Sequence, residues 1–184
     1  MDPDPIEAPS IRPSHIVHQE GVIAVLAIVG LALTERGPAA ALAAEGGTGR
    51  SVAVGLGAGA ACVAVLFVLR RLPPVERLER WQRAVVADWT TTDAVAVALV
   101  SGVAEEALIR ALLQPILGLV PAAAVFAVLH VVPDRRLWFW PLFALVAGIL
   151  LGVLFDGYGY PAAAAAHVVI NLVALVRLAR GPGE

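Results

Sequence analysis

Three ionisable side chains lie within one apolar stretch of the sequence. Glu105, Glu106 and Arg110 occur about eleven or more residues after this stretch begins at Ala94. A charge at the centre of a membrane helix costs about 2.5 to 3.5 kcal/mol on insertion scales, so it is rarely tolerated there without a partner or a water-filled cavity. Glu106 and Arg110 are four positions apart and can pair along one helix face. Glu105 points about 100° away and is left for another role, and the role of general base or proton shuttle suits a buried carboxylate.

Two more pairs of side chains recur at helical spacing on later apolar stretches. Phe126 and His130 are four residues apart, and so are His167 and Asn171. The two side chains of each pair therefore lie on one face of their helix. Taken singly, each polar residue could be a structural ion pair or a hydrogen bond between helices. Taken together with Glu105, at a similar depth from the arginine-rich ends, they predict one shared reactive site.

Six apolar stretches must carry these residues. The chain is 59% hydrophobic and 15% charged, whereas a soluble domain has about 25% charged residues. Backbone polar groups cannot stay unpaired in lipid, so each stretch is predicted to be a helix. We predict an all-α, polytopic membrane bundle of about six transmembrane helices, forming one domain over residues 17–180. The stretches are 17–33, 52–69, 94–117, the short 121–132, 137–155 and 161–176.

The segment 1–16 is rich in proline and acidic residues and is predicted to be a disordered tail. The apolar run that follows has the length of a signal-peptide core. Its flank is acidic and holds only Arg12 as a basic residue, which favours a retained helix.

The arginines predict the orientation of the bundle. They gather in the segments 70–83, 135–136 and 177–180, and short arginine-rich loops stay in the cytoplasm. Both termini are therefore predicted to be cytoplasmic, in a multi-pass protein of the cell membrane. The formal net charge of -2 and the absence of one large basic patch argue against nucleic acid as a partner. Arginine without lysine, in an alanine-rich chain, suggests a bacterial inner membrane.

The segment after the second stretch has an amphipathic pattern. Val75, Leu78, Trp81 and Val85 recur near helical spacing, with arginines on the remaining positions. This pattern predicts an interfacial helix on the cytoplasmic leaflet, with a solvated linker as the alternative. Gln114 and Cys62 are interpreted as packing residues.

The three motifs together resemble a known family. Glu-Glu-x-x-x-Arg at 105–110, Phe-x-x-x-His at 126–130 and His-x-x-x-Asn at 167–171 are similar, in type and order, to those of the CPBP family of intramembrane endopeptidases. This family comprises the CAAX proteases and the bacteriocin-processing enzymes also called Abi proteins. The resemblance covers about 98–175. The family commonly has Phe before and Gly after the motif arginine, where this chain has Ile109 and Ala111.

The resemblance implies hydrolysis of a peptide bond near the membrane surface, in a membrane-associated protein or a CAAX-like C-terminus. Glu105 would activate the attacking water with help from His130. His167 and Asn171 would donate hydrogen bonds to the developing oxyanion, each worth about 3 kcal/mol. Glu106 would belong to the same catalytic set, as a supporting element held by Arg110. The supporting residues would be Arg110 and Phe126.

Other interpretations stay open at this stage. Glu105, His130 and His167 form a sufficient ligand set for a catalytic zinc. Metal-free catalysis by the glutamate is supported about equally well by the sequence. The single cysteine excludes a cysteine-based zinc site within one chain. The same polar residues could serve an inactive scaffold or immunity protein of this fold, or a proton relay in a transporter component. The sequence lacks the internal repeat expected of such a transporter.

Overall fold

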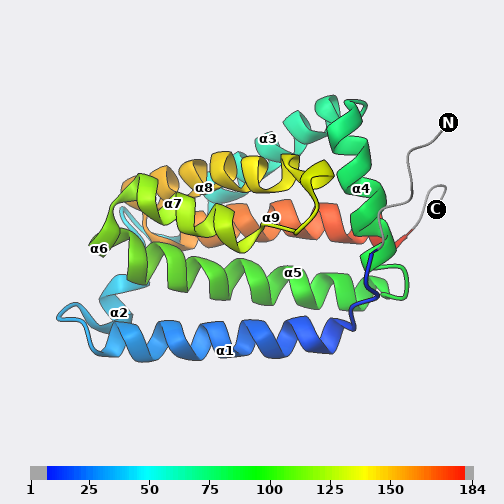
Figure 1. The fold of residues 1–184 in the computed structure, drawn as a ribbon. Helices are drawn as coiled ribbons and strands as arrows, with labels where there is room; N and C mark the ends of the chain where they lie inside the picture. The colour runs from blue at the N-terminus through cyan, green and yellow to red at the C-terminus, as the bar shows by residue number, and fades with distance from the viewer. Residues whose placement is uncertain (1–7, 181–184) are drawn as a thin grey trace, which may run out of the picture.

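Helices make up nearly all of residues 8–180, the part of the chain that the computed structural model describes (Figure 1). Within this range there is no strand, only one isolated bridge between Ala44 and Gly159. The predicted all-α class is therefore confirmed. The elements in chain order are α1 (Pro13–Ala32), α2 (Gly37–Ala41), α3 (Thr48–Leu69), α4 (Pro73–Val85), α5 (Thr91–Glu106), η1 (Ala107–Leu113), α6 (Gln114–Leu117), α7 (Leu119–Leu129), η2 (Arg135–Leu137), α8 (Phe139–Tyr158) and α9 (Tyr160–Ala179).

Four of the described helices are long and apolar enough to cross a membrane: α1, α3, α8 and α9. The third predicted stretch is one continuous run of α5, the π-helix η1 and α6, and it carries the charged motif. The fourth is α7, which is apolar but has only 11 residues. All six predicted stretches thus lie on helices of one membrane bundle.

The helix that carries Glu105 begins at a strong start signal. The Thr90 side chain accepts a hydrogen bond from the Asp93 backbone N–H at 3.1 Å, and the Asp93 carboxylate accepts one from the Thr90 N–H at 2.9 Å. This reciprocal capping box satisfies two backbone donors that would otherwise be unpaired. The start of α5, and with it the rotation of its later residues, is thereby fixed.

Close backbone contact places α9 between α3 and α5. A Cβ atom on Gly55 of α3 would lie 2.3 Å from the Ala162 carbonyl oxygen of α9. A Cβ atom on Gly102 of α5 would lie 2.6 Å from the Val168 side chain of the same helix. Only glycine allows both approaches. As a result, the polar residues of α9 can reach those of α5.

The arginine-rich segments lie toward one end of the bundle. Figure 1 shows α4 crossing the end where α1 begins and α9 finishes, whereas α2 and α6 lie at the other end. The short helix η2, with its two arginines, contacts α4. This clustering agrees with the predicted topology, and the cytoplasmic side itself remains a prediction.

The amphipathic segment forms α4, but its apolar face is used differently from the prediction. The four residues predicted from spacing, Val75, Leu78, Trp81 and Val85, are the buried residues of this helix. Leu78, Trp81 and Val85 belong to a cluster that includes residues of α5, η2 and α9. The apolar face therefore packs on the end of the bundle. The sequence had instead predicted that this face inserts into the cytoplasmic leaflet.

The predicted tail over 1–16 is only partly within the described residues, since 1–7 lie outside them. Residues 8–16 pack against the bundle. The indole N–H of Trp89 donates to the Ile11 carbonyl at 2.7 Å, and α1 already begins at Pro13.

Candidate active site

Glu106 is the centre of a buried polar network that joins two helices. Its Oε2 atom accepts a hydrogen bond from Arg110 Nε at 3.1 Å, and its Oε1 atom lies 2.9 Å from His167 Nδ1. Glu106 and Arg110 are fully buried. The predicted pair of Glu106 and Arg110 is confirmed. The contact with His167 shows in addition that the first and third motifs meet.

The π-helix η1 carries Arg110. A wider turn of this kind rotates the residues after it relative to an α-helix, and such turns are frequent at functional sites. The Arg110 guanidinium carbon lies 5.4 Å from the ring centroid of Phe126, and its NH1 group donates to Gln114 Oε1 at 3.3 Å. The cation is therefore held by a carboxylate, an amide and an aromatic face.

Gln114 has more partners than a simple packing residue. Its amide nitrogen donates to the Gly152 carbonyl at 3.1 Å and to Asp156 Oδ1 at 2.8 Å, both on α8. Gln114 thus links the charged motif to α8 by hydrogen bonds. Residue spacing within one helix could not predict this contact between two helices.

Phe126 stands between the two motif histidines. Its ring centroid is 4.5 Å from that of His130 and 5.5 Å from that of His167. His130 follows the last residue of α7, and its Nδ1 lies 2.8 Å from the Phe126 carbonyl oxygen. Because a carbonyl can only accept, this nitrogen carries the hydrogen and Nε2 is the basic one.

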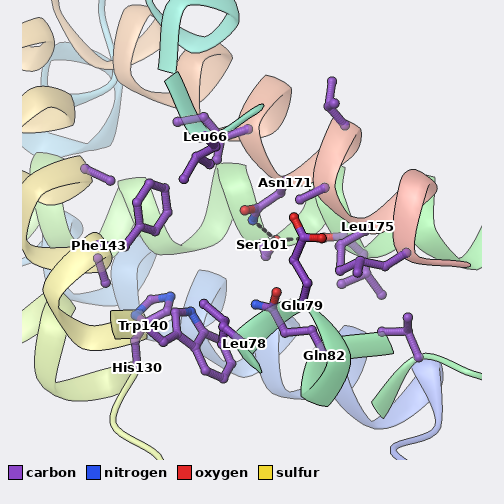
Figure 2. A pocket seen from close by; sticks show the side chains of 18 of the residues that line it. Leu66, Leu78, Glu79, Gln82, Ser101, His130, Trp140, Phe143, Asn171 and Leu175 are labelled. Atoms are coloured by element: carbon purple, nitrogen blue, oxygen red, sulfur yellow. Dashed lines mark hydrogen bonds between the residues drawn. The ribbon is translucent and has the colours of Figure 1, made fainter. Parts of the chain in front are cut away.

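Asn171 is oriented by a residue that the sequence analysis did not single out. Its Nδ2 group donates to Ser101 Oγ at 3.0 Å, and Ser101 donates to the Val97 carbonyl at 2.8 Å. Figure 2 shows the contact between Asn171 and Ser101 at the wall of the pocket. Ser101 precedes Glu105 by four positions, so helical spacing could have placed both on one face.

A cavity of about 350 Å³ joins these side chains. Glu105, His130, His167 and Asn171 all line it, together with Ser101. Its wall is otherwise mainly apolar and continues to α4 at the arginine-rich end. The described lining does not include Glu106 or Arg110. The structure therefore brings Glu105 and both histidines to one cavity, with Glu106 behind His167.

Glu20 is a buried acid at this cavity that the sequence analysis did not single out. It lies on α1, its exposed fraction is 4%, and it lines the same cavity as Glu105. The available signal was its position, since Glu20 falls three residues inside the first predicted stretch that begins at Val17.

The zinc ligand set predicted from the sequence stays a prediction. Among residues 8–180 no three or more His, Cys, Asp or Glu side chains are grouped so that they could hold a metal ion. Glu105, His130 and His167 line one cavity.

The fold and the site define a helical membrane protein with acids and histidines around an internal cavity. The model of a protein family described as Rce1-like, type II CAAX prenyl endopeptidase, matches residues 87–173. This region is similar to that family, and the predicted resemblance to the CPBP and CAAX proteases is confirmed. The matched region begins after α4, so α1 and α3 lie outside it. No curated protein and no solved structure matches the chain.

Proposed function

We propose that this protein is an intramembrane endopeptidase that cuts a membrane-associated peptide or a CAAX-like C-terminus. One observation carries the proposal. Of the two adjacent motif acids, Glu105 lines the cavity with His130, His167 and Asn171, while Glu106 is bound to Arg110. One acid is thus available for chemistry and the other has a supporting role.

Glu105 acts as the general base. Its Oε2 atom is buried and has no hydrogen-bond partner within the described chain, so it can accept a proton from a water in the cavity. The water oxygen bonds to the peptide carbonyl carbon as its proton moves to Glu105. His130 lines the same cavity, and its basic Nε2 helps to orient that water.

His167 and Asn171 stabilise the oxyanion that forms in this step. His167 directs Nδ1 at Glu106, and in its imidazolium form it donates Nε2–H toward the cavity. Asn171 uses one amide hydrogen on Ser101 and keeps the other for the substrate. Donors fixed before the reaction stabilise developing charge without reorganisation, and each contributes about 3 kcal/mol.

The shape of the cavity fits a peptide substrate at the membrane. Its apolar wall continues from the polar residues to α4, where Leu78 and Trp81 line it. Pockets with mainly apolar walls and a few polar groups bind such ligands with a defined orientation. The predicted topology opens this end to the cytoplasm, and a bacterial inner membrane is the proposed location.

The test is cleavage of a peptide library by the purified protein in detergent, followed by mass spectrometry. Glu105→Gln keeps shape and hydrogen bonding but cannot take up a proton, so the rate should fall about 10² to 10⁴-fold. The matched control is Glu35→Gln, an exposed acid in the turn after α1, which should keep full activity.

Two results separate the alternatives. Loss of activity with a chelator, restored by zinc, would show that a metal takes part and that Glu105 is a ligand. A wild-type protein that cuts no peptide, and binds one without change, would favour the inactive scaffold or immunity protein.

A further inference from the structure

Arg177 lies at the arginine-rich end of the cavity that contains the candidate catalytic residues. It belongs to the last turn of α9 and lines the cavity. Within the described lining it is the only arginine or lysine, whereas Glu20, Glu79 and Glu105 are acids. A guanidinium stays charged at any physiological pH. The end of a mainly apolar cavity therefore carries one permanent positive charge.

The position of Arg177 along α9 suits one end of a peptide bound in this cavity. Arg177 follows Ile170 by seven positions and Ala174 by three, and both of these line the cavity. The three side chains therefore share one broad helix face. Asn171 lies six positions before Arg177, which corresponds to a rise of about 9 Å. An extended chain spans about 3.3 Å per residue, so a segment of a few residues can reach from Asn171 to Arg177.

A carboxylate from α4 contacts Arg177 in this structure. Glu79 Oε1 accepts a hydrogen bond from Arg177 Nη2, and the two side chains form an ion pair between α4 and α9. Figure 2 shows the Glu79 carboxylate directed toward α9. The pair is partly open to solvent, since 40% of the Arg177 side chain and 26% of the Glu79 side chain are exposed. The arginine thus already holds a carboxylate at a position that another ligand can reach.

The contact with Glu79 leaves most of the guanidinium donors unused. It is the one hydrogen bond of the Arg177 side chain within residues 8–180, and a guanidinium has five N–H donors. Arginine binds a carboxylate best through two parallel N–H···O bonds. Partly exposed ion pairs are weak, so a carboxylate that makes both bonds can displace Glu79.

We infer that Arg177 is a specificity-determining residue that binds a carboxylate group of the peptide substrate in exchange for Glu79. This inference rests on the proposed peptidase function and gives the bound substrate a direction. The carboxylate lies at the α4 end of the cavity, because Arg177 attracts it there and ionised Glu105 repels it at the other end. The carboxylate comes from a free C-terminus or from an acidic side chain, and the experiment separates these two sources.

The experiment measures binding of dye-labelled peptides to the purified protein in detergent by fluorescence anisotropy. Glu105→Gln is the background, so that the probes are not cleaved during the measurement. An apolar leucine–alanine peptide is used with a free C-terminus, with an amidated C-terminus, and with an amidated C-terminus plus one internal aspartate. We expect amidation to weaken binding about tenfold if the C-terminus is the source. If an acidic side chain is the source, the peptide with aspartate should bind about tenfold more tightly than the plain amide.

Two variants separate carboxylate binding from a structural role of the ion pair. Arg177→Gln should weaken binding of the peptide that carries the carboxylate about tenfold and leave the plain amide unchanged. Glu79→Gln removes the competing carboxylate and should strengthen binding of the same peptide. Both variants lose the same ion pair, so a purely structural pair would change binding in the same direction in both. Arg180→Gln, at an exposed arginine after α9, is the matched control and should bind all three peptides as the background does.

Cleavage by the wild type is measured separately, with peptides from the library prepared as acids and as amides. Equal binding and equal cleavage of both forms would overturn the role of Arg177 and leave the peptidase function intact. An effect of Glu79→Gln in the same direction as Arg177→Gln would also overturn it. Carboxylate-dependent binding that requires Arg177, without any cleavage, would refute the peptidase function, while Arg177 would remain a ligand-binding residue.

Discussion

Glu105 and Glu106 are adjacent in the chain but belong to two different polar regions. Glu106, Arg110 and Gln114 form a closed network, away from the cavity, that reaches α8 and is fully or almost fully buried. Among its buried side-chain atoms in the described chain, Arg110 Nη2 has no hydrogen-bond partner. Glu105 belongs to an open group that lines the cavity and retains an unpaired oxygen. A buried polar network in which most groups are paired holds a fold in one arrangement, whereas an unpaired group at a cavity remains available to a ligand. Two adjacent residues of one helix therefore differ in role: Glu106 supports the fold, and Glu105 remains available for chemistry.

The largest effect is expected from opening the closed network. Arg110→Ala leaves Glu106 fully buried without its cation, and removal of one partner of a buried pair typically costs about 3 to 5 kcal/mol. We expect strongly reduced expression and a lower unfolding temperature in detergent, with loss of cleavage. Arg180→Ala, at an exposed arginine after α9, is the control. Unchanged thermal stability of Arg110→Ala would show that the ion pair does not support the fold.

A smaller effect on stability is expected from the link to α8. Gln114→Ala removes the amide that bonds Arg110, Gly152 and Asp156, and unpaired buried polar groups cost about 1 to 3 kcal/mol. The unfolding temperature should fall while kcat of the folded protein stays within a few-fold of wild type. Gln19→Ala, at an exposed position on α1, serves as the control. A large loss of kcat at unchanged stability would place Gln114 in the reactive group.

The open group should respond in the opposite way. Ser101→Ala removes the acceptor that orients Asn171, and one such hydrogen bond contributes about 0.5 to 1.5 kcal/mol. We expect kcat to fall up to about tenfold with little change in unfolding temperature. Ser14→Ala, at an exposed position of α1, should change neither. Equal kcat in Ser101→Ala and wild type would show that Asn171 needs no orientation by Ser101.

The smallest effect is expected outside both regions, in the loop before α8. Hydrogen bonds from the Arg136 side chain and backbone hold the pKa of Asp134 below its ordinary value. Because the folded pKa is lowered, this stabilisation is present above the ordinary pKa of about 3.9 and is lost as the pH falls through the lowered value. Asp134→Asn should therefore lower the unfolding temperature slightly at neutral pH and have no effect at the acidic end. A larger deficit at low pH than at neutral pH would contradict this assignment.

The sequence by itself determined what depends on spacing along one helix. The six apolar stretches follow from composition and length along the chain. The pairing of Glu106 with Arg110 and the buried face of α4 follow from helical periodicity, which is also a local property. Only the tertiary structure decided which helix faces meet. The contact of Glu106 with His167, the support of Asn171 by Ser101 and the position of Glu20 at the cavity that Glu105 lines join residues up to 85 positions apart. Such partners depend on how each helix is rotated and on how closely small residues such as Gly102 let the backbones approach, and no periodicity within a single helix encodes that rotation.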